Sequence, residues 1–189
     1  MDQSDEALIE SYHAGNDPAL VTLIERHFAG VYSYVYRMVR NTATAEDVTQ
    51  EVFIKVWQKL HRFKAGTGLK PWLFRIARNT AIDHLRKRQN IPLSYFEEQG
   101  DEALFIDTST SALEEMMERE DGALLSESVQ LLSLNYREVL LLRAEHGMTF
   151  EEISQTIAKP LNTVKSLYRR GLAKLHQIIA SKRTIQYEQ

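Results

Sequence analysis

The sequence lacks cysteine, has few turn-forming residues and contains no long apolar run. Without cysteine the chain forms no disulfide scaffold, no zinc finger and no thiol nucleophile, which suits a reducing cytosol. No apolar run approaches about eighteen residues, and the acidic start MDQSDEALIE does not resemble a signal peptide. We therefore expect a cytoplasmic protein that does not insert into a membrane. Only 8 Gly and 4 Pro in 189 residues favour long helices over a turn-rich sheet.

The net charge of −3 hides a strong asymmetry along the chain. Residues 61–90 carry eight basic and one acidic side chain, and residues 159–183 carry seven basic side chains and no acid. Between them, residues 91–128 carry eleven acids and one base. Two basic blocks of this kind are typical of nucleic-acid-binding faces, although two solvated basic helix faces would give the same counts.

Helical periodicity and helix-start signals run through most of the chain. Asp17-Pro18 places a cap residue before proline, and Thr44, Asn135 and Thr149 each precede an acid by three positions. No segment alternates with strand period for long, so we expect an all-α protein. The expected helices lie near residues 5–14, 18–41, 44–60, 70–89, 113–133, 136–146, 149–157 and 162–180.

The stretch from Gln89 to Leu113 contains Pro92, Gly100 and a Ser/Thr cluster, and its apolar residues keep no helical period. These features indicate a linker that extends through the acidic residues 114–121. We therefore expect two helical domains, over residues 1–90 and 122–189, joined by an acidic linker over residues 91–121.

The expected helix 44–60 has two different faces. An apolar face suited to the core gathers Val48, Val52, Phe53, Val56, Trp57 and Leu60. The opposite face gathers acids, an amide and one isoleucine: Asp47, Gln50, Glu51 and Ile54. Such a face fits docking against a basic or mixed partner helix, and it also fits a plain solvated surface.

Residues 61–90 combine aromatic and basic side chains. In the expected helix an inward stripe of Leu73, Ile76, Ala77 and Thr80 opposes a stripe of cations, an amide and one isoleucine: Arg75, Arg78, Asn79, Ile82 and Arg86. Phe63 and Trp72 lie beside the basic stripe. Guanidinium groups neutralise phosphates and aromatic rings stack on unpaired bases, so this segment suits DNA, whereas core packing is the alternative role for the two rings.

The C-terminal segment has the layout of a helix-turn-helix, with helix 149–157, the breaker sequence 158–161 and helix 162–180. The early turns of the last helix present short polar and cationic side chains, as a helix in a major groove requires. A helical hairpin with an uninvolved basic face is the alternative. The complete absence of acids from residues 159–183 argues against it.

Three segments together resemble the extracytoplasmic-function (ECF) group of sigma-70-type RNA polymerase sigma factors. They are AEDVTQEVFIKVWQKL (45–60), PWLFRIARNTAIDHLRKR (71–88) and MTFEEISQTIAKPLNTVKSLYRRGLAKL (148–175), in the family's order and spacing. The chain departs from the family at Ala158, where glycine is frequent, and at Leu167 and Leu172, where arginine is frequent.

The resemblance implies a role for each face. Segment 45–60 resembles region 2.2, which docks on the polymerase β′ clamp helices and would use Asp47, Gln50, Glu51 and Ile54. Segment 71–88, with the residues just before it, resembles regions 2.3 and 2.4, which melt and capture the −10 element and would use Phe63, Trp72, Arg75, Arg78, Asn79 and Arg86. Segment 148–175 resembles region 4.2, which reads the −35 duplex and would use Asn162, Thr163, Lys165, Ser166, Arg169 and Arg170.

The partners implied by the resemblance are core RNA polymerase, through its β′ clamp helices and β flap, promoter DNA and an anti-sigma factor. We expect no enzyme activity, because no nucleophile has a base and the six histidines show no metal-ligand spacing. We likewise expect no cofactor, no metal and no small-molecule substrate. Two further alternatives are a two-domain DNA-binding regulator that does not dock on polymerase, and a helical adaptor without a DNA role, which the basic blocks argue against.

Overall fold

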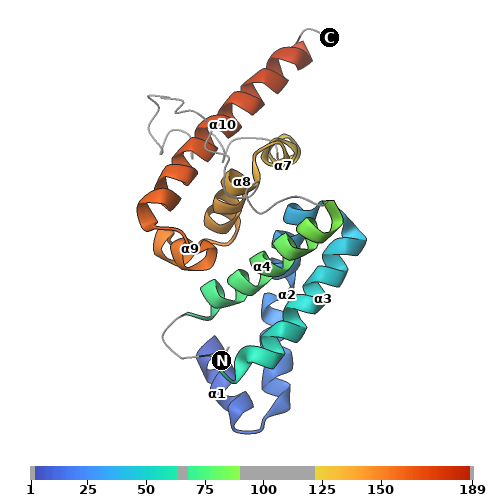
Figure 1. Ribbon diagram of the computed structural model, residues 1–189, viewed down its shortest axis with the longest axis vertical. Helices are drawn as coiled ribbons and strands as arrows, with labels where there is room; N and C mark the ends of the chain where they lie inside the picture. The colour runs from blue at the N-terminus through green and yellow to red at the C-terminus, as the bar shows by residue number, and fades with distance from the viewer. Residues whose placement is uncertain (1–2, 64–67, 90–121, 188–189) are drawn as a thin grey trace. The chain divides into compact units, whose positions relative to one another are not determined.

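The computed structural model describes residues 3–63, 68–89 and 122–187, and the regular structure within these ranges is helical (Figure 1). The predicted all-α fold is therefore confirmed. The helices form two compact units, one with α1 to α4 and the other with α7, α8, most of α9 and α10, while residues 155–158 at the end of α9 are grouped with the first unit. The acidic linker expected at residues 91–121 lies outside the described residues, as does the first part of the helix expected at 113–133.

The first unit contains α1 (Asp5–His13), α2 (Asp17–Val39), α3 (Thr42–Leu60) and α4 (Leu69–Gln89). α2 packs against the other three helices, and α3 also packs against α4. Tyr34 of α2 meets the ring of Phe74 edge-on, with ring centroids 5.4 Å apart. The core between these helices consists of fully or almost fully buried side chains, including Val31, Tyr34, Val35, Met38, Val48, Val52, Val56, Leu73, Phe74 and Ala77.

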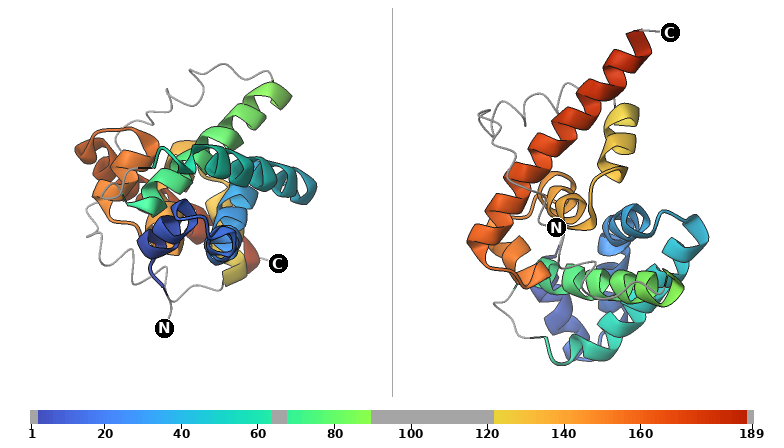
Figure 2. Two further views of the ribbon diagram at one scale, coloured as in Figure 1. Left: turned by 90° about the horizontal axis from the view of Figure 1, so that it is seen from below. Right: turned by 45° about the horizontal axis from the view of Figure 1, so that its top comes forward.

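The second unit contains α7 (Gly122–Gln130), α8 (Leu134–Leu140), a π-helical turn (Leu141–Glu145), α9 (Phe150–Ile157) and α10 (Leu161–Tyr187). α10 is one unbroken helix with α8 packed beside it (Figure 2). Gly171 permits this close packing, because a Cβ atom there would lie 3.3 Å from Cβ of Tyr136. The core gathers Val129, Leu132, Tyr136, Val139, Leu140, Leu142, Met148, Ile153, Val164, Tyr168, Leu172, Leu175 and Ile179.

Three helices begin earlier than their predicted caps indicate. α2 begins at Asp17, so its N-cap is Asn16 and not Asp17. α3 begins at Thr42, because Asn41 acts as its N-cap and accepts a hydrogen bond from the backbone N–H of Thr44 at 2.9 Å. The prediction that Thr44 caps this helix is therefore wrong. α8 likewise begins at Leu134, so Asn135 lies inside the helix rather than at its cap.

The turn between α9 and α10 places Ala158 in the left-handed region, with φ of +53°. The side chain of Ser154 closes this turn by donating from Oγ to the carbonyl oxygen of Lys159 at 2.6 Å. A left-handed conformation strains any residue with a Cβ atom, which agrees with the frequent glycine at this position in the family that the sequence resembles.

Replacing Ala158 by glycine is expected to raise the free energy of unfolding by about 1 kcal/mol, because glycine adopts positive φ without strain. Urea unfolding followed by far-ultraviolet circular dichroism measures the change. The matched control, Ala180→Gly, lies on the exposed surface of α10 and should lower stability by about 1 kcal/mol. If Ala158→Gly lowered the free energy of unfolding, this would contradict backbone strain at Ala158.

Candidate nucleic-acid interface

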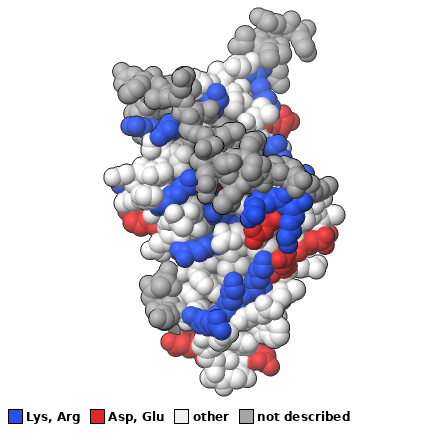
Figure 3. Space-filling view, viewed as in Figure 1, with Lys and Arg blue, Asp and Glu red and all other residues white. Residues whose placement is uncertain are grey.

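α4 presents a basic face on the first unit. Arg75, Asn79 and Arg86 are exposed and Arg78 is partly exposed, whereas the opposite stripe of Leu73, Ile76, Ala77 and Thr80 is buried, as predicted. Ile82, which was predicted to lie on the outward stripe, is buried, so that part of the prediction is wrong. Figure 3 shows a row of Lys and Arg side chains across the face on which α4 lies. The stripe is therefore a row of guanidinium groups with one amide, a chemistry that suits a phosphate backbone.

Phe63 and Trp72 are half-buried, with ring centroids 5.2 Å apart and ring planes inclined at 58°. Both rings pack against an apolar cluster in the first unit made by Leu8, Ile9, Ala19, Leu23, Leu60 and Leu69. The sequence left open whether these rings pack in the core or face DNA. Each ring does part of both, because one part of its surface is packed against the cluster and another part is in contact with solvent.

The outer face of α3 is exposed at all four predicted docking residues, Asp47, Gln50, Glu51 and Ile54. Ile54 keeps 53% of its surface in contact with solvent. The carboxylate of Glu51 lies 2.7 Å from Nζ of Lys55, one turn further along the helix. An exposed isoleucine surrounded by polar groups is a feature of protein-binding surfaces.

Trp57 belongs to this outer face, and the prediction that it lies in the core is wrong. Its side chain is 56% exposed, and its indole Nε1 donates a hydrogen bond to Oη of Tyr12 at 3.1 Å. At 100° per residue Trp57 is close to Gln50 and Ile54 around the helix axis, at the border of the apolar stripe. The prediction relied on the hydrophobicity of tryptophan, whereas the angular position of Trp57 is at the border between the apolar stripe and the outer face.

Exposed apolar side chains concentrate on α2 and α3. Of the six large hydrophobic side chains exposed among the described residues, five lie on these two helices: Val21, Phe28, Tyr36, Ile54 and Trp57. Phe28 stacks on Tyr32 and on Phe53, with centroid distances of 6.4 and 5.7 Å. The exposed residues of α2 were not predicted from the sequence, although Phe28, Tyr32 and Tyr36 recur every four positions along this helix.

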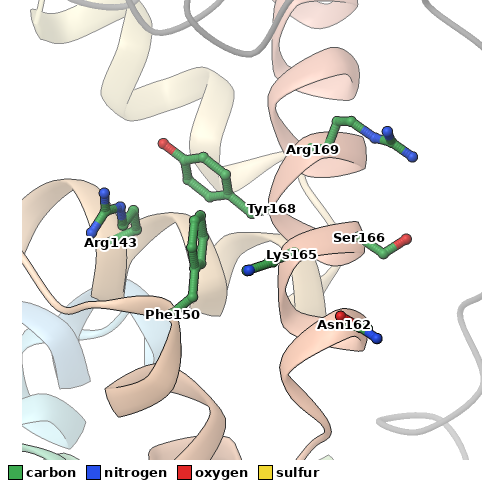
Figure 4. A pocket seen from close by; sticks show the side chains of 7 residues that line it. All are labelled: Arg143, Phe150, Asn162, Lys165, Ser166, Tyr168 and Arg169. Atoms are coloured by element: carbon green, nitrogen blue, oxygen red, sulfur yellow. The ribbon is translucent and has the colours of Figure 1, made fainter.

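An open pocket of about 660 Å³ lies in the second unit between the π-helical turn, α9 and the first turns of α10 (Figure 4). Four of the six residues predicted to read the −35 duplex line it, namely Asn162, Lys165, Ser166 and Arg169. Asn162, Ser166 and Arg169 extend from one side of α10, whereas Lys165 points toward Phe150.

The two remaining predicted residues lie outside this lining. Thr163 is exposed on the first turn of α10. Arg170 is partly buried, and its guanidinium donates to Oγ of Ser166 at 2.8 Å from Nη2 and at 3.3 Å from Nε. Arg170 therefore holds the hydroxyl of Ser166 in place at the edge of the pocket.

Arg143 forms the opposite wall of the pocket, and its position is fixed by two contacts. Its Nη1 donates to the carbonyl oxygen of Met148 at 2.8 Å, and its guanidinium carbon lies 4.9 Å from the centre of the Phe150 ring. The Phe150 ring in turn meets Tyr168 edge-on at 5.3 Å. Arg143 is thus a cation held in place in the pocket lining, on the side of Phe150 that lies away from α10.

A predicted capping box holds Phe150 in position. The backbone N–H of Thr149 donates to Oε2 of Glu152 at 2.7 Å, and that of Glu152 donates to Oγ1 of Thr149 at 3.1 Å. This confirms the capping box predicted from Thr149 and Glu152.

Sequence reasoning missed Arg143, Phe150 and Tyr168 as lining residues. The π-helical turn inserts an additional residue, seen in the bond from the His146 N–H to the Leu141 carbonyl oxygen, and this shifts the angular position of Arg143 from that of a regular α-helix. The π turn has no sequence signal of its own.

Two kinds of feature were not found among the described residues. Across 3–63, 68–89 and 122–187, no group of three or more His, Asp or Glu side chains is arranged to hold a metal ion. Nor does this part of the chain contain a helix long and apolar enough to cross a membrane.

Comparison with known proteins agrees with the division into two units. The family model described as Sigma-70 region 2 matches residues 23–91, and that described as Sigma-70, region 4 matches residues 123–175. RNA polymerase sigma-H factor of Pseudomonas aeruginosa is 31% identical over 87% of this chain and 88% of its own length. ECF RNA polymerase sigma-E factor of Escherichia coli K12 is also 31% identical, over 86% of this chain and 87% of its own length.

A solved structure shows the same fold. It contains the sigma factor RpoE in complex with the anti-sigma factor NepR from Bartonella quintana, and it matches with a TM-score of 0.64 at 23% identity. The match covers 83% of this chain and 94% of that chain.

The two matching regions and the relatives define the class as sigma-70-type initiation factors. Within that class the chain belongs to the ECF sigma factors. It is accordingly a DNA-binding regulator that binds core RNA polymerase and directs transcription initiation at specific promoters.

Proposed function

We propose that the two units divide promoter recognition between opened and paired DNA. The α4 face, with Phe63, Trp72 and the exposed cations, holds unpaired bases of the −10 element. The α9–α10 unit reads the −35 duplex, with the early turns of α10 in the major groove. The observation that best supports this division is the pocket of the second unit, whose lining includes four of the six residues expected to read the −35 duplex.

The chemistry of each face suits its assigned DNA. Partly exposed aromatic rings offer stacking worth about 1–3 kcal/mol per base, which helps to offset the cost of unpairing. The amide of Asn162 and the hydroxyl of Ser166 are short polar groups that hydrogen-bond base edges, while Lys165 and Arg169 neutralise phosphates. Because one chain carries both units, binding of one raises the effective concentration of the other.

The outer face of α3, with Asp47, Gln50, Glu51 and Ile54, docks on the β′ clamp helices of the polymerase in this proposal. The exposed Trp57 adds apolar area to this face, and Phe28, Tyr32 and Tyr36 form a separate aromatic row on α2. We further propose that the second unit contacts the β flap, that an anti-sigma factor controls the protein and that it acts in the cytoplasm. These proposals rest on the family and on the exposed apolar side chains of the first unit.

Promoter-directed transcription tests the proposed function. Purified chain is mixed with core RNA polymerase, promoters are selected from a random-sequence DNA library, and run-off transcripts are measured from the selected templates. We expect run-off only when both the chain and core enzyme are present, with permanganate-reactive thymines in the −10 segment. Failure to bind core enzyme, or binding without any promoter-dependent transcript, would contradict the proposal.

We further propose that Arg143 contacts a phosphate of the −35 duplex. Replacing Arg143 by glutamine is therefore expected to weaken binding of the selected −35 duplex about tenfold and to reduce the salt dependence by about one phosphate contact. The loss should be uniform across DNA sequences, because a phosphate contact carries no base information. Fluorescence anisotropy at several salt concentrations measures both effects. The affinity of Arg143→Lys should lie between those of the unchanged chain and Arg143→Gln, since lysine keeps the charge but lacks a planar group to stack on Phe150.

The control for this prediction is Arg62→Gln, which removes an exposed arginine from the first unit. It should leave binding of the −35 duplex unchanged. An Arg143→Gln variant with an unaltered salt slope, or with a changed base preference, would show that Arg143 does not contact phosphate.

A further inference from the structure

Helix α1 carries four contact residues on one face. Asp5, Leu8, Ile9 and Tyr12 follow one another at helical spacing, and Leu8 and Ile9 are almost completely buried. The helix contains only nine residues. An isolated helix of this length is marginal in water, so α1 depends on its contacts with the rest of the first unit to remain folded.

Asp5 anchors the start of α1 to α2 through both of its carboxylate oxygens. Oδ1 accepts a hydrogen bond from Nη1 of Arg26 at 2.7 Å, and Oδ2 lies 2.8 Å from Nε2 of His27. The three side chains are only 17–25% exposed. Because water is largely excluded, this contact stabilises the docked helix more than a fully exposed ion pair would.

The apolar part of α1 belongs to the same cluster as the proposed base-stacking rings. Leu8 and Ile9 are buried in it with Leu60 and Leu69, and the partly buried rings of Phe63 and Trp72 pack against it. Phe63 follows the end of α3 and Trp72 lies in the first turn of α4. The cluster therefore connects α1 with both rings.

We propose that α1 is a positioning element for promoter opening. Docking of α1 through Asp5 and Leu8 holds Phe63 and Trp72 in the arrangement that stacks on unpaired −10 bases. This inference rests on the proposed role of these two rings. Asp5 and Leu8 touch no DNA, and they act only through the rings that the cluster supports.

We expect α1 to affect binding of an unpaired strand through the fraction of molecules in which α1 is docked. If only the docked state has ordered rings, the apparent affinity for an unpaired strand falls with the fraction of molecules in which α1 is docked. Asp5→Asn removes the charge that faces Arg26 and His27 and keeps the shape of the side chain. Leu8→Ala removes buried apolar surface from the cluster itself.

Two measurements on the full chain test the proposal. The chain has 2 tryptophans, so a Trp57→Phe background leaves Trp72 as the sole indole, and acrylamide quenching then reports its exposure. This background also removes the hydrogen bond from Trp57 to Tyr12 of α1, so every variant is compared with Trp57→Phe itself. A labelled single strand carrying the opened segment of a selected promoter reports base capture. In Asp5→Asn and Leu8→Ala we expect stronger quenching of Trp72 and about threefold to tenfold weaker single-strand binding.

Matched controls separate positioning from general instability. Glu6→Gln makes the same charge change at the neighbouring exposed position and should alter neither measurement. Asp5→Glu keeps the carboxylate and should restore most of the single-strand affinity. Binding of the −35 duplex by the second unit should remain unchanged in every variant, and circular dichroism confirms that each variant is folded.

The outcomes distinguish this inference from the proposed function. If Trp72→Ala weakens single-strand binding but folded Asp5→Asn leaves both measurements unchanged, α1 does not position the rings and the proposed function stands. If Phe63→Ala and Trp72→Ala both leave single-strand binding unchanged, the proposed role of the rings fails and the inference fails with it. Should Leu8→Ala not fold, Asp5→Asn decides alone.

Discussion

Replacing Arg137 by methionine is expected to lower the free energy of unfolding of the second unit by about 3 kcal/mol. Arg137 is 8% exposed, and its guanidinium donates to three backbone carbonyl oxygens where α7 ends. Its Nη2 donates to Gln130 at 2.9 Å and to Leu132 at 2.8 Å, and its Nε approaches the oxygen of Val129 at 3.4 Å. Methionine fills similar volume but leaves these acceptors without their charged donor at the negative end of a helix.

The location of the tryptophans allows this loss to be assigned to one unit. Trp57 and Trp72 both lie in the first unit, so their fluorescence follows that unit, whereas circular dichroism follows all helices. In urea, Arg137→Met should shift the dichroism transition and leave the fluorescence transition in place. The control Arg169→Met removes an exposed arginine from α10 and should change stability by less than about 0.5 kcal/mol. An Arg137→Met variant as stable as this control would contradict the proposed stabilisation by the hydrogen bonds of Arg137.

Changing Ile54 to aspartate together with Asp47 to alanine is expected to weaken binding of core RNA polymerase about 100-fold. Ile54 is the most apolar residue of the proposed docking face, and a charge placed at its position would have to be desolvated against the partner. Both positions are exposed, so the fold should be unaffected. Binding is measured with labelled chain and purified core enzyme.

The same experiment decides between the proposed function and its main alternative. A DNA-binding regulator that acts without docking on polymerase would show no change in any of its activities on this substitution. The control Lys59→Ala removes an exposed residue from another side of α3 and should leave core binding unaltered. Binding of the −35 duplex by the isolated chain should also be unaltered, since that unit is untouched.

The helices were predictable because periodicity and caps act locally. α1, α2, α4 and α9 begin and end within two residues of their expected bounds. α10 continues to Tyr187 rather than ending near residue 180, because the apolar stripe ends there but no glycine or proline interrupts the helix. Hydrophobic periodicity predicts where a helix packs, and only breakers predict where it stops.

The outer faces of α3 and α4 were predictable for the same reason, since a helix fixes the angular order of its side chains. The remaining lining of the second unit's pocket depends on tertiary contacts that periodicity does not express. Arg143 reaches the pocket through a backbone irregularity, and Phe150 joins it through contacts with Arg143 and Tyr168. Residues that meet only after the chain has folded leave little trace in a local pattern.

The angle between α8 and Arg143 around the helix axis depends on the number of residues in the π-helical turn Leu141–Glu145. It depends less on which side chains those residues carry. One residue spans about 100° of helical rotation, so an in-frame loss of a single codon there would restore regular winding and swing the two parts out of alignment. Every amino acid could be retained on either side and the wall of the pocket would still be displaced. This turn should therefore accept substitutions more readily than insertions or deletions.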